Sequence, residues 1–478
     1  MSQATIAEVE AIALADRSVH ESRIARILGR TVFGALLGLI VLTAIPYATS
    51  HVWWKAAFVS IVFILAILWL VEGLISSSWF RDNWPLVLPV ATLATFSFLQ
   101  TVPSGKQGNN SAGISFTPWN AISADPYQTR FFALQLLALT LAAVFLFSYA
   151  SSEKRLRILI NVVIGTAVAS AIFGILRQTT PYNVGSILPL PPDVGYGQFI
   201  NRNHFALLME MAFGLIIGLL LGSGVQREKG LIYLAALLPI WMALVLCSSR
   251  GGLIAMLAQI GAAGLLSSVL APKGRSDPPQ SKILTITQSL PVRLILILAL
   301  IVGVIFGTLW LGGDRLATRI EERPELNAGD GGLRVGANRN DIWKATWRMF
   351  LAHPLLGVGM GGYWIAVPAY HDASGTMTPQ EAHNDYLELL ASGGLVGFGM
   401  GVWFAVIVIR RTRQNMAARN RFRRAACLGA TIGIAGVAVH SLVDFGLHVV
   451  VNALVFTTLI VIATSNTQWQ NEPMKLHE

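Results

Sequence analysis

Charged residues are scarce in this sequence. Only 13% of its 478 residues are Asp, Glu, Lys or Arg, whereas 54% are hydrophobic. Ordinary soluble domains carry about 25% charged residues, so this composition cannot build the water-exposed surface of a globular protein. The shortage of charge therefore excludes a soluble domain and predicts a membrane protein.

Cysteine is also scarce. The two cysteines, Cys247 and Cys427, fall near opposite ends of predicted membrane spans, so we expect no disulfide. The sequence also lacks a visible internal repeat or low-complexity tract. No small-residue cleavage site follows its first apolar run, which therefore predicts an anchor and not a removed signal peptide.

Long apolar runs dominate what remains. A spanning helix needs about 20 mostly apolar residues, and a membrane barrel would instead show short alternating segments. The sequence therefore predicts an all-α, polytopic membrane protein of about twelve transmembrane helices, near 31–48, 54–75, 84–101, 131–150, 156–176, 203–222, 230–247, 252–270, 292–312, 386–409, 425–444 and 449–465.

The positions of Lys and Arg predict the orientation of these helices. Most of them fall in segments that would be cytoplasmic if the N-terminus were inside, which favours an even number of spans. The net charge of +10 then belongs mainly to loops that face anionic lipid headgroups. A nucleic-acid partner would need a continuous basic face, and we expect none.

These boundaries predict five regions along the chain. They are a cytoplasmic amphipathic segment (1–30), transmembrane helices one to nine (31–312), a long periplasmic loop with short surface helices (313–385), transmembrane helices ten to twelve (386–465) and a cytoplasmic tail (466–478).

Part of the long loop has a helical pattern. Trp343, Trp347 and Phe350 recur at helical spacing, with Asn340 or Asp341 as a cap, so a helix along the membrane surface is expected. The glycine-rich segment 357–362, which follows it, predicts a tight, close-packed turn. A phosphate-binding glycine loop is the weaker alternative, because no strand precedes the segment.

Four polar clusters are predicted at the outer face. They are Asn201 to His204 with Glu210 deeper on the same helix, Ser248 to Gly252, Arg339, and Glu381 to Tyr386. Each has a plain alternative. Arg202 can reach from a helix end to the interface, His383 can be an ordinary loop histidine, and Glu210 can hydrogen-bond Arg or His.

A fifth polar pattern lies in the last hairpin. His440, Asp444 and His448 follow at intervals of four, which suits either a metal site or a polar contact between helices. We favour the polar contact.

Together these residue types favour chemistry on a diphosphate. Arginines hold a diphosphate through paired hydrogen bonds, and a nearby imidazole can take a proton from an attacking hydroxyl. A lipid-linked diphosphate would enter sideways from the bilayer.

Several stretches resemble the O-antigen ligase and polymerase superfamily of bacterial envelope enzymes. They are Ser249 to Gly252, Arg339 to Gly362, His383 to Gly397, the ending Val443 to Phe445 with His448 and Asn452, and the NRNHF stretch at 201–205. Each motif is short, but their order and spacing are specific and cover residues 195–465.

The resemblance implies a glycosyltransferase of the large membrane (GT-C-like) type. It would work without cofactor or metal, in the bacterial inner membrane, with its active site facing the periplasm. It would move an oligosaccharide or polysaccharide from undecaprenyl diphosphate to a hydroxyl of another glycan, of lipid A core or of another acceptor. No acidic metal cluster is visible outside, which agrees with charge stabilisation by arginine.

The resemblance also implies roles for single residues. Arg250 and Arg339 would bind the diphosphate, and His383 would be the base or would position the acceptor. The other candidates for substrate binding are Arg202, His204, Glu210, Asn384 and Asp444. Ligase and polymerase remain open, with a slight preference for polymerase.

Two other classes of protein fit the sequence less well. A transporter or flippase for a lipid-linked glycan would favour internal repeats and ionisable residues in mid-span, and only Glu210 fits. A structural membrane scaffold would not gather its polar residues on one side.

Overall fold

The computed structural model describes residues 3–465 except 46, 77–82, 104–120, 180–194, 270–338, 372–378 and 419. In this part of the chain there are thirteen α-helices and no strand, as the apolar runs predicted. The predicted ninth span, 292–312, lies outside the described residues.

Eight helices are long and apolar enough to cross a membrane. They are α1 (Gln3–Ala44), α2 (Val52–Ser76), α4 (Pro126–Tyr149), α5 (Glu153–Thr179), α6 (Arg202–Leu221), α7 (Arg227–Leu246), α13 (Asp385–Met416) and α14 (Arg421–His440). Three shorter helices are also apolar, namely α3 (Trp84–Leu99), α8 (Arg250–Val269) and α15 (Val450–Thr464). The other predicted runs therefore all form helices, and the fold is that of a polytopic membrane protein.

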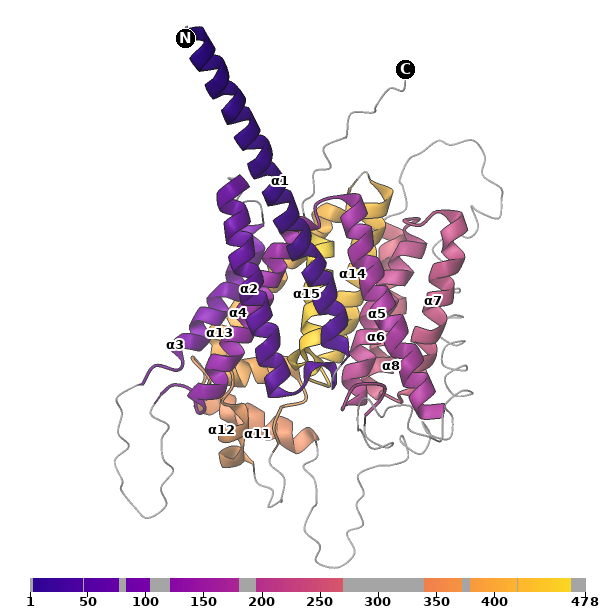
Figure 1. The fold of residues 1–478 in the computed structure, drawn as a ribbon. Helices are drawn as coiled ribbons and strands as arrows, with labels where there is room; N and C mark the ends of the chain where they lie inside the picture. The colour runs from indigo at the N-terminus through magenta and orange to yellow at the C-terminus, as the bar shows by residue number, and fades with distance from the viewer. Residues whose placement is uncertain are drawn as a thin grey trace, which may run out of the picture.

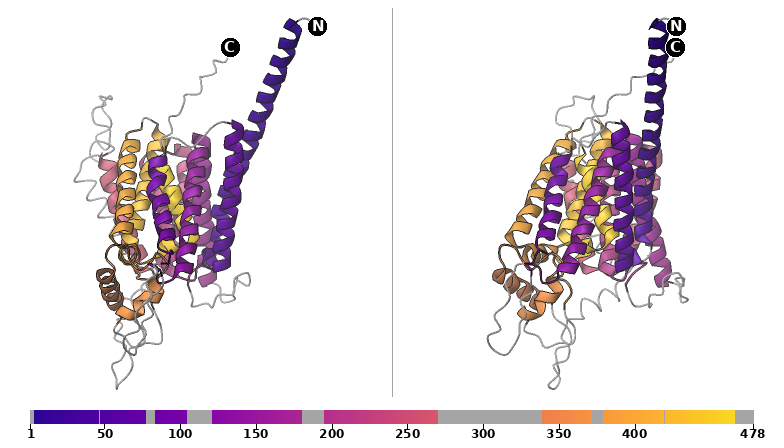
Figure 2. Two further views of the ribbon diagram at one scale, coloured as in Figure 1. Left: turned by 90° about the vertical axis from the view of Figure 1, so that its left-hand side faces the viewer. Right: turned by 60° about the vertical axis from the view of Figure 1, so that its left-hand side comes forward.

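The helices form a bundle with α14 and α15 near its centre (Figure 1). Two short helices, α11 (Arg339–Ala352) and α12 (Tyr363–Ala366), lie across one end, which we call the α11 end. The two turned views also place this end opposite the projecting start of α1 (Figure 2). The long loop thus contains the short helices that its sequence predicted.

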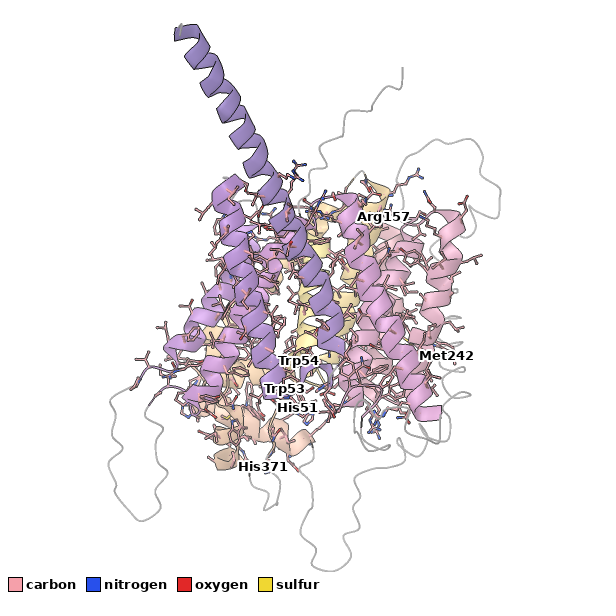
Figure 3. All side chains as sticks on the ribbon, viewed as in Figure 1. His51, Trp53, Trp54, Arg157, Met242 and His371 are labelled. Atoms are coloured by element: carbon pink, nitrogen blue, oxygen red, sulfur yellow. The ribbon has the colours of Figure 1, made fainter. Side chains whose placement is uncertain are left out.

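Interfacial residues agree with this arrangement. His51, Trp53 and Trp54 lie toward the α11 end, whereas Arg157 lies at the opposite end (Figure 3). The Trp53 side chain is exposed, as expected for an aromatic residue at a membrane surface. Arg157 lies at the end that the charge distribution predicted to be cytoplasmic.

The centre of the bundle is held by close helix packing. Gly214 and Gly218 of α6 meet Gly433 and Gly429 of α14. A Cβ on Gly214, Gly218 or Gly429 would overlap the facing backbone, and a Cβ on Gly433 would crowd it. Small residues let membrane helices approach closely, where dispersion and polar contacts replace the hydrophobic effect. This contact fixes α6 against α14, and both helices lead to the candidate site.

Two predicted boundaries change. The amphipathic segment predicted at 1–30 and the first span form one continuous helix, α1, which projects from the bundle along its own axis (Figure 1). The span predicted at 425–444 ends at His440, because residues 441–449 form the turn into α15. This turn carries Asp444 and His448 out of the helix.

The predicted surface helix is α11. Ile342, Ala345, Thr346 and Met349 are buried, whereas Trp347 is exposed. The aromatic spacing thus predicted the helix, and residues between the aromatic ones form its buried face.

Candidate active site

A buried carboxylate at the α11 end lies between two imidazoles. Asp444, in the turn after α14, is 1% exposed. Its Oδ1 lies 3.6 Å from Nδ1 of His383, which precedes α13, and 3.9 Å from Nε2 of His204 in the first turn of α6. Three segments far apart in the sequence therefore meet at one charge.

The surroundings of Asp444 keep it ionised. Burial would raise the pKa of this carboxyl, but His383, His204 and the Phe445 N–H, which donates to Oδ1 at 2.9 Å, outweigh burial. The pKa of Asp444 therefore lies well below its usual range. A fixed negative charge beside an imidazole orients the ring and stabilises its protonated form.

His383 has the geometry of a residue held for a task. Its backbone adopts φ +51°, which non-glycine residues rarely adopt outside turns and functional sites. The ring of Phe445 contacts His383 edge-on at a centroid distance of 4.8 Å. The His383 side chain is 32% exposed, so with Nδ1 buried beside Asp444 its other nitrogen, Nε2, remains available for a substrate.

The starts of α6 and α8 are joined beside this centre. Asn201 caps α6 through the Asn203 N–H, and Ser249 Oγ donates to Asn203 Oδ1 at 2.9 Å. Arg202 and Arg250 are the first residues of the two helices. The hydrogen bond between Ser249 and Asn203 thus joins the residue before Arg250 to the residue before His204.

The α11 helix brings Arg339 to the same region. Arg339 begins α11, and Trp343, one turn later, donates its indole N–H to the Ala382 carbonyl at 3.0 Å. Ala382 directly precedes His383. The side chains of Arg339 and Arg250 are exposed, and among the described residues neither has a hydrogen bond or ion pair. Both guanidinium groups are therefore available to an anion.

The other predicted site residues have structural partners. Glu210 is fully buried and pairs with His440 of α14, whose Nδ1 lies 2.7 Å from Glu210 Oε1. Of the two alternatives for Glu210, the structural hydrogen bond is thus observed. The Asn384 side chain caps α13 by accepting from the N–H groups of Tyr386 and Leu387. Arg202 is half-buried.

The histidines and aspartate of the last hairpin do not share one ligand site. His440 contacts Glu210, Asp444 contacts His383 and His204, and His448 contacts a different set of carboxylates. The polar contact between helices, favoured over a metal face for these residues, is therefore what the structure contains.

A second polar cluster, which no sequence pattern predicted, surrounds His448. Its ring nitrogens lie 3.4 Å from Glu381, 3.7 Å from Asp385 and 3.6 Å from Glu388. Burial would lower the pKa of His448, but Glu381 and Glu388 raise it to about 10. Burial would raise the pKa of Glu381, but His448 lowers it to about 2.

The side chains of this cluster include the ligand groups of a cation site. One ligand atom each from Glu381, Glu388 and His448 lies within 4.8 Å of the others, so these groups could hold a metal ion. No acidic metal cluster was expected at the outer face, but the turn after α14 brings these three side chains together. The spacing of Glu381, Asp385 and Glu388, four and three residues apart, was the available signal.

The glycine segment 357–362 packs tightly, as predicted. Gly357 (φ +66°) lies against the Ser392 backbone, and Gly359 (φ +98°) lies against Ser123. The phosphate-loop alternative is wrong, because every N–H from Gly357 to Gly362 already has a protein acceptor. No donor of this segment is left for an anion.

Comparison with known proteins agrees with the residue pattern. Residues 234–402 match the family model described as O-antigen ligase, and this segment includes Arg250, Arg339 and His383. No curated protein matches the chain.

Proposed function

We propose that this member of the O-antigen ligase and polymerase superfamily transfers a glycan from a lipid diphosphate to an acceptor hydroxyl. The family match supports a membrane protein that handles lipid-linked glycans in the manner of a glycosyltransferase. The donor proposed is an undecaprenyl-diphosphate-linked oligosaccharide or polysaccharide. The reaction is placed at the α11 end, which would face the periplasm from the bacterial inner membrane.

The contact between His383 and Asp444 carries this proposal. His383 Nδ1 lies 3.6 Å from Asp444 Oδ1, so the carboxylate would orient the ring with Nε2 toward the acceptor hydroxyl, from which Nε2 would take a proton. The hydroxyl oxygen then bonds to the anomeric carbon of the donor sugar. The bond from this carbon to the diphosphate oxygen breaks, and its electron pair leaves with the diphosphate.

Arg250 and Arg339 would stabilise the leaving group. Guanidinium groups bind phosphate oxygens through paired hydrogen bonds, and fixed charges near a developing anion lower the barrier to its departure. Both arginines begin helices that are bonded close to the two histidines of the centre. This arrangement supports a reaction that needs no metal ion.

The test is transfer by the purified full-length protein in lipid nanodiscs. Arg250→Ala, Arg339→Ala and His383→Ala should each abolish transfer from an undecaprenyl-diphosphate-linked oligosaccharide while the protein still inserts and melts normally. Arg348→Ala, nearer the other end of α11, is the matched control and should stay active. Full activity in all three variants would contradict the proposal.

The size of the product identifies the acceptor. The same donor is offered with lipid A core, with a second lipid-linked glycan, or with protein. A ladder of longer lipid-linked glycans would assign a polymerase, and a single addition to lipid A core would assign a ligase. Movement of the donor across the membrane without transfer would support the flippase alternative instead.

A further inference from the structure

A cavity beside the candidate active site has no part in the chemistry described so far. Its volume is about 470 Å³, within the usual range of small-ligand sites. It lies between α2, α3, α4, α13 and α15, and its walls are mostly apolar and aromatic, including Phe58, Leu93, Leu136, Phe147, Phe404 and Phe456. Such walls suit a hydrocarbon.

The cavity is long and follows the helices. On α4 its lining extends from Gln128 to Phe147, and on α13 from Asp385 to Phe404. With a rise of 1.5 Å per residue, each stretch covers about 28 Å, close to the hydrocarbon thickness of a bilayer. A long apolar space inside the membrane-spanning region fits a lipid chain better than a compact ligand.

One end of the cavity is polar. Lys55, Glu381, Asp385, Glu388 and His448 line it there, at the α11 end. The ring of Phe445 separates this mouth from the candidate base, since its centroid lies 5.7 Å from that of His448 and 4.8 Å from that of His383. A head group at the mouth would therefore be one aromatic ring away from the reacting imidazole.

The charges at the mouth distinguish the two substrates of a transfer reaction. Three carboxyl groups face one lysine and one histidine, so the mouth has no excess of cationic groups to hold a diphosphate. Neither Arg250 nor Arg339 lines the cavity. Carboxylates repel a diphosphate, whereas carboxylates and an imidazole readily exchange hydrogen bonds with sugar hydroxyls.

A buried hydroxyl supports a polar contact deeper in the cavity. Ser392, one turn after Glu388 on α13, lines the same space, and its Oγ is buried without a hydrogen-bond partner among the described residues. Buried polar atoms are usually paired, so an unpaired one in a cavity wall points to a partner supplied by a ligand.

We propose that this cavity binds the lipid chain of the acceptor, with hydroxyls of its head sugar held by Glu381, Glu388 and His448. The proposal rests on the proposed function, because it assigns the second substrate of that reaction. The donor diphosphate then belongs to Arg250 and Arg339, and His383 lies between the two substrates.

The decisive experiment narrows the cavity. Leu389→Trp fills it from α13, and Leu395→Trp adds the same bulk to an exposed position of the same helix. Acceptors would be alkyl glycosides with one sugar head and either a short or a long chain, and the donor an undecaprenyl-diphosphate-linked oligosaccharide. Folding of both variants would be checked by thermal melting in nanodiscs.

In the unmodified protein the long-chain acceptor should show the lower KM. Leu389→Trp should raise the KM of the long-chain acceptor about tenfold, equivalent to about 1.4 kcal/mol, and remove the advantage of the long chain. The KM of the donor should change less than twofold, and Leu395→Trp should match the unmodified protein. Glu381→Gln should raise the KM of both acceptors equally, because it acts on the head sugar.

Two results would overturn the proposal. A rise in the KM of the donor alone would assign the cavity to the donor chain, and unchanged constants in a folded Leu389→Trp protein would show that no substrate enters it. Failure of the proposed function looks different, because the unmodified protein would then transfer glycan to no acceptor.

Discussion

The start of α8 offers a sharp test of how Arg250 is positioned. Gly251 and Gly252 follow Arg250 and lie against the buried pair formed by Glu210 and His440. A Cβ at position 252 would lie 2.8 Å from Ala206 Cβ and 3.2 Å from Glu210 Oε1. Ordinary contacts begin near 3.4 Å, so Gly252→Ala must move α8 or α6 by about 0.6 Å.

Two effects should follow from this displacement. Overpacking of a well-filled site costs roughly 1–3 kcal/mol of stability. Misplacing an aligned group by about 1 Å can lower a rate by about a hundredfold, so a shift of Arg250 should lower transfer by about tenfold or more. Gly251→Ala should act similarly, because its Cβ would lie 3.1 Å from His440 Nε2 and 3.0 Å from a Val443 methyl group.

The matched control is Gly261→Ala on the same helix, where nothing lies within 4 Å of an added Cβ. Because alanine favours helix over glycine by about 1 kcal/mol, this variant should be active and slightly more stable. Transfer rates and thermal melting in nanodiscs measure both effects. A Gly252→Ala protein with normal rate and melting temperature would refute this reasoning.

Three other predictions concern charge. Asp444→Asn should lower the transfer rate about a hundredfold or more, because the base loses its orienting charge, while the exposed Asp341→Asn should not. The Glu381–His448 pair should stabilise the fold fully between pH 4.5 and 6.5. This stability should be lost as the pH falls through about 2, where Glu381 is protonated, or rises through about 10, where His448 is deprotonated. In thermal melts of the His448→Gln protein, the loss of stability at alkaline pH should disappear. A chelator should leave transfer intact, and a loss reversed by added Mg²⁺ would instead assign Glu381, Glu388 and His448 to a metal site.

Local pattern predicted most of the fold. Apolar run length gave the spanning helices, because a membrane requires each span to satisfy its own backbone hydrogen bonds. The aromatic spacing and caps of 340–351 likewise predicted α11. The pattern could not predict which face of α11 is buried, since that depends on the residues packed against it.

The candidate site was predicted in part. His383 and Asp444 were named from their motifs and His204 from its expected proximity, and the structure brings the three together. The cluster around His448 was missed because its members meet only through the turn that begins after His440. The length of α14 therefore decided which residues became neighbours, and sequence patterns locate helix ends poorly. Contacts such as Glu210 with His440 depend on the α6–α14 packing and leave no local signal.

The two histidines beside Asp444 are not equivalent, and their difference yields a final prediction. Both rings lie within 4 Å of Asp444 Oδ1, so either could be oriented by it. A base must also reach its substrate, and the His204 side chain is only 9% exposed, whereas the His383 side chain is 32% exposed.

His383→Gln should therefore abolish transfer, because glutamine keeps a polar contact to Asp444 but cannot accept the proton. His204→Gln should keep measurable transfer, with a loss of about tenfold, because His204 acts only through the placement of Asp444. Transfer rates over a pH series separate the two roles. The rate of the His204→Gln protein should keep the pH dependence of the unmodified protein, because the base is unchanged. If His204→Gln removes this dependence while His383→Gln retains it, the base is His204.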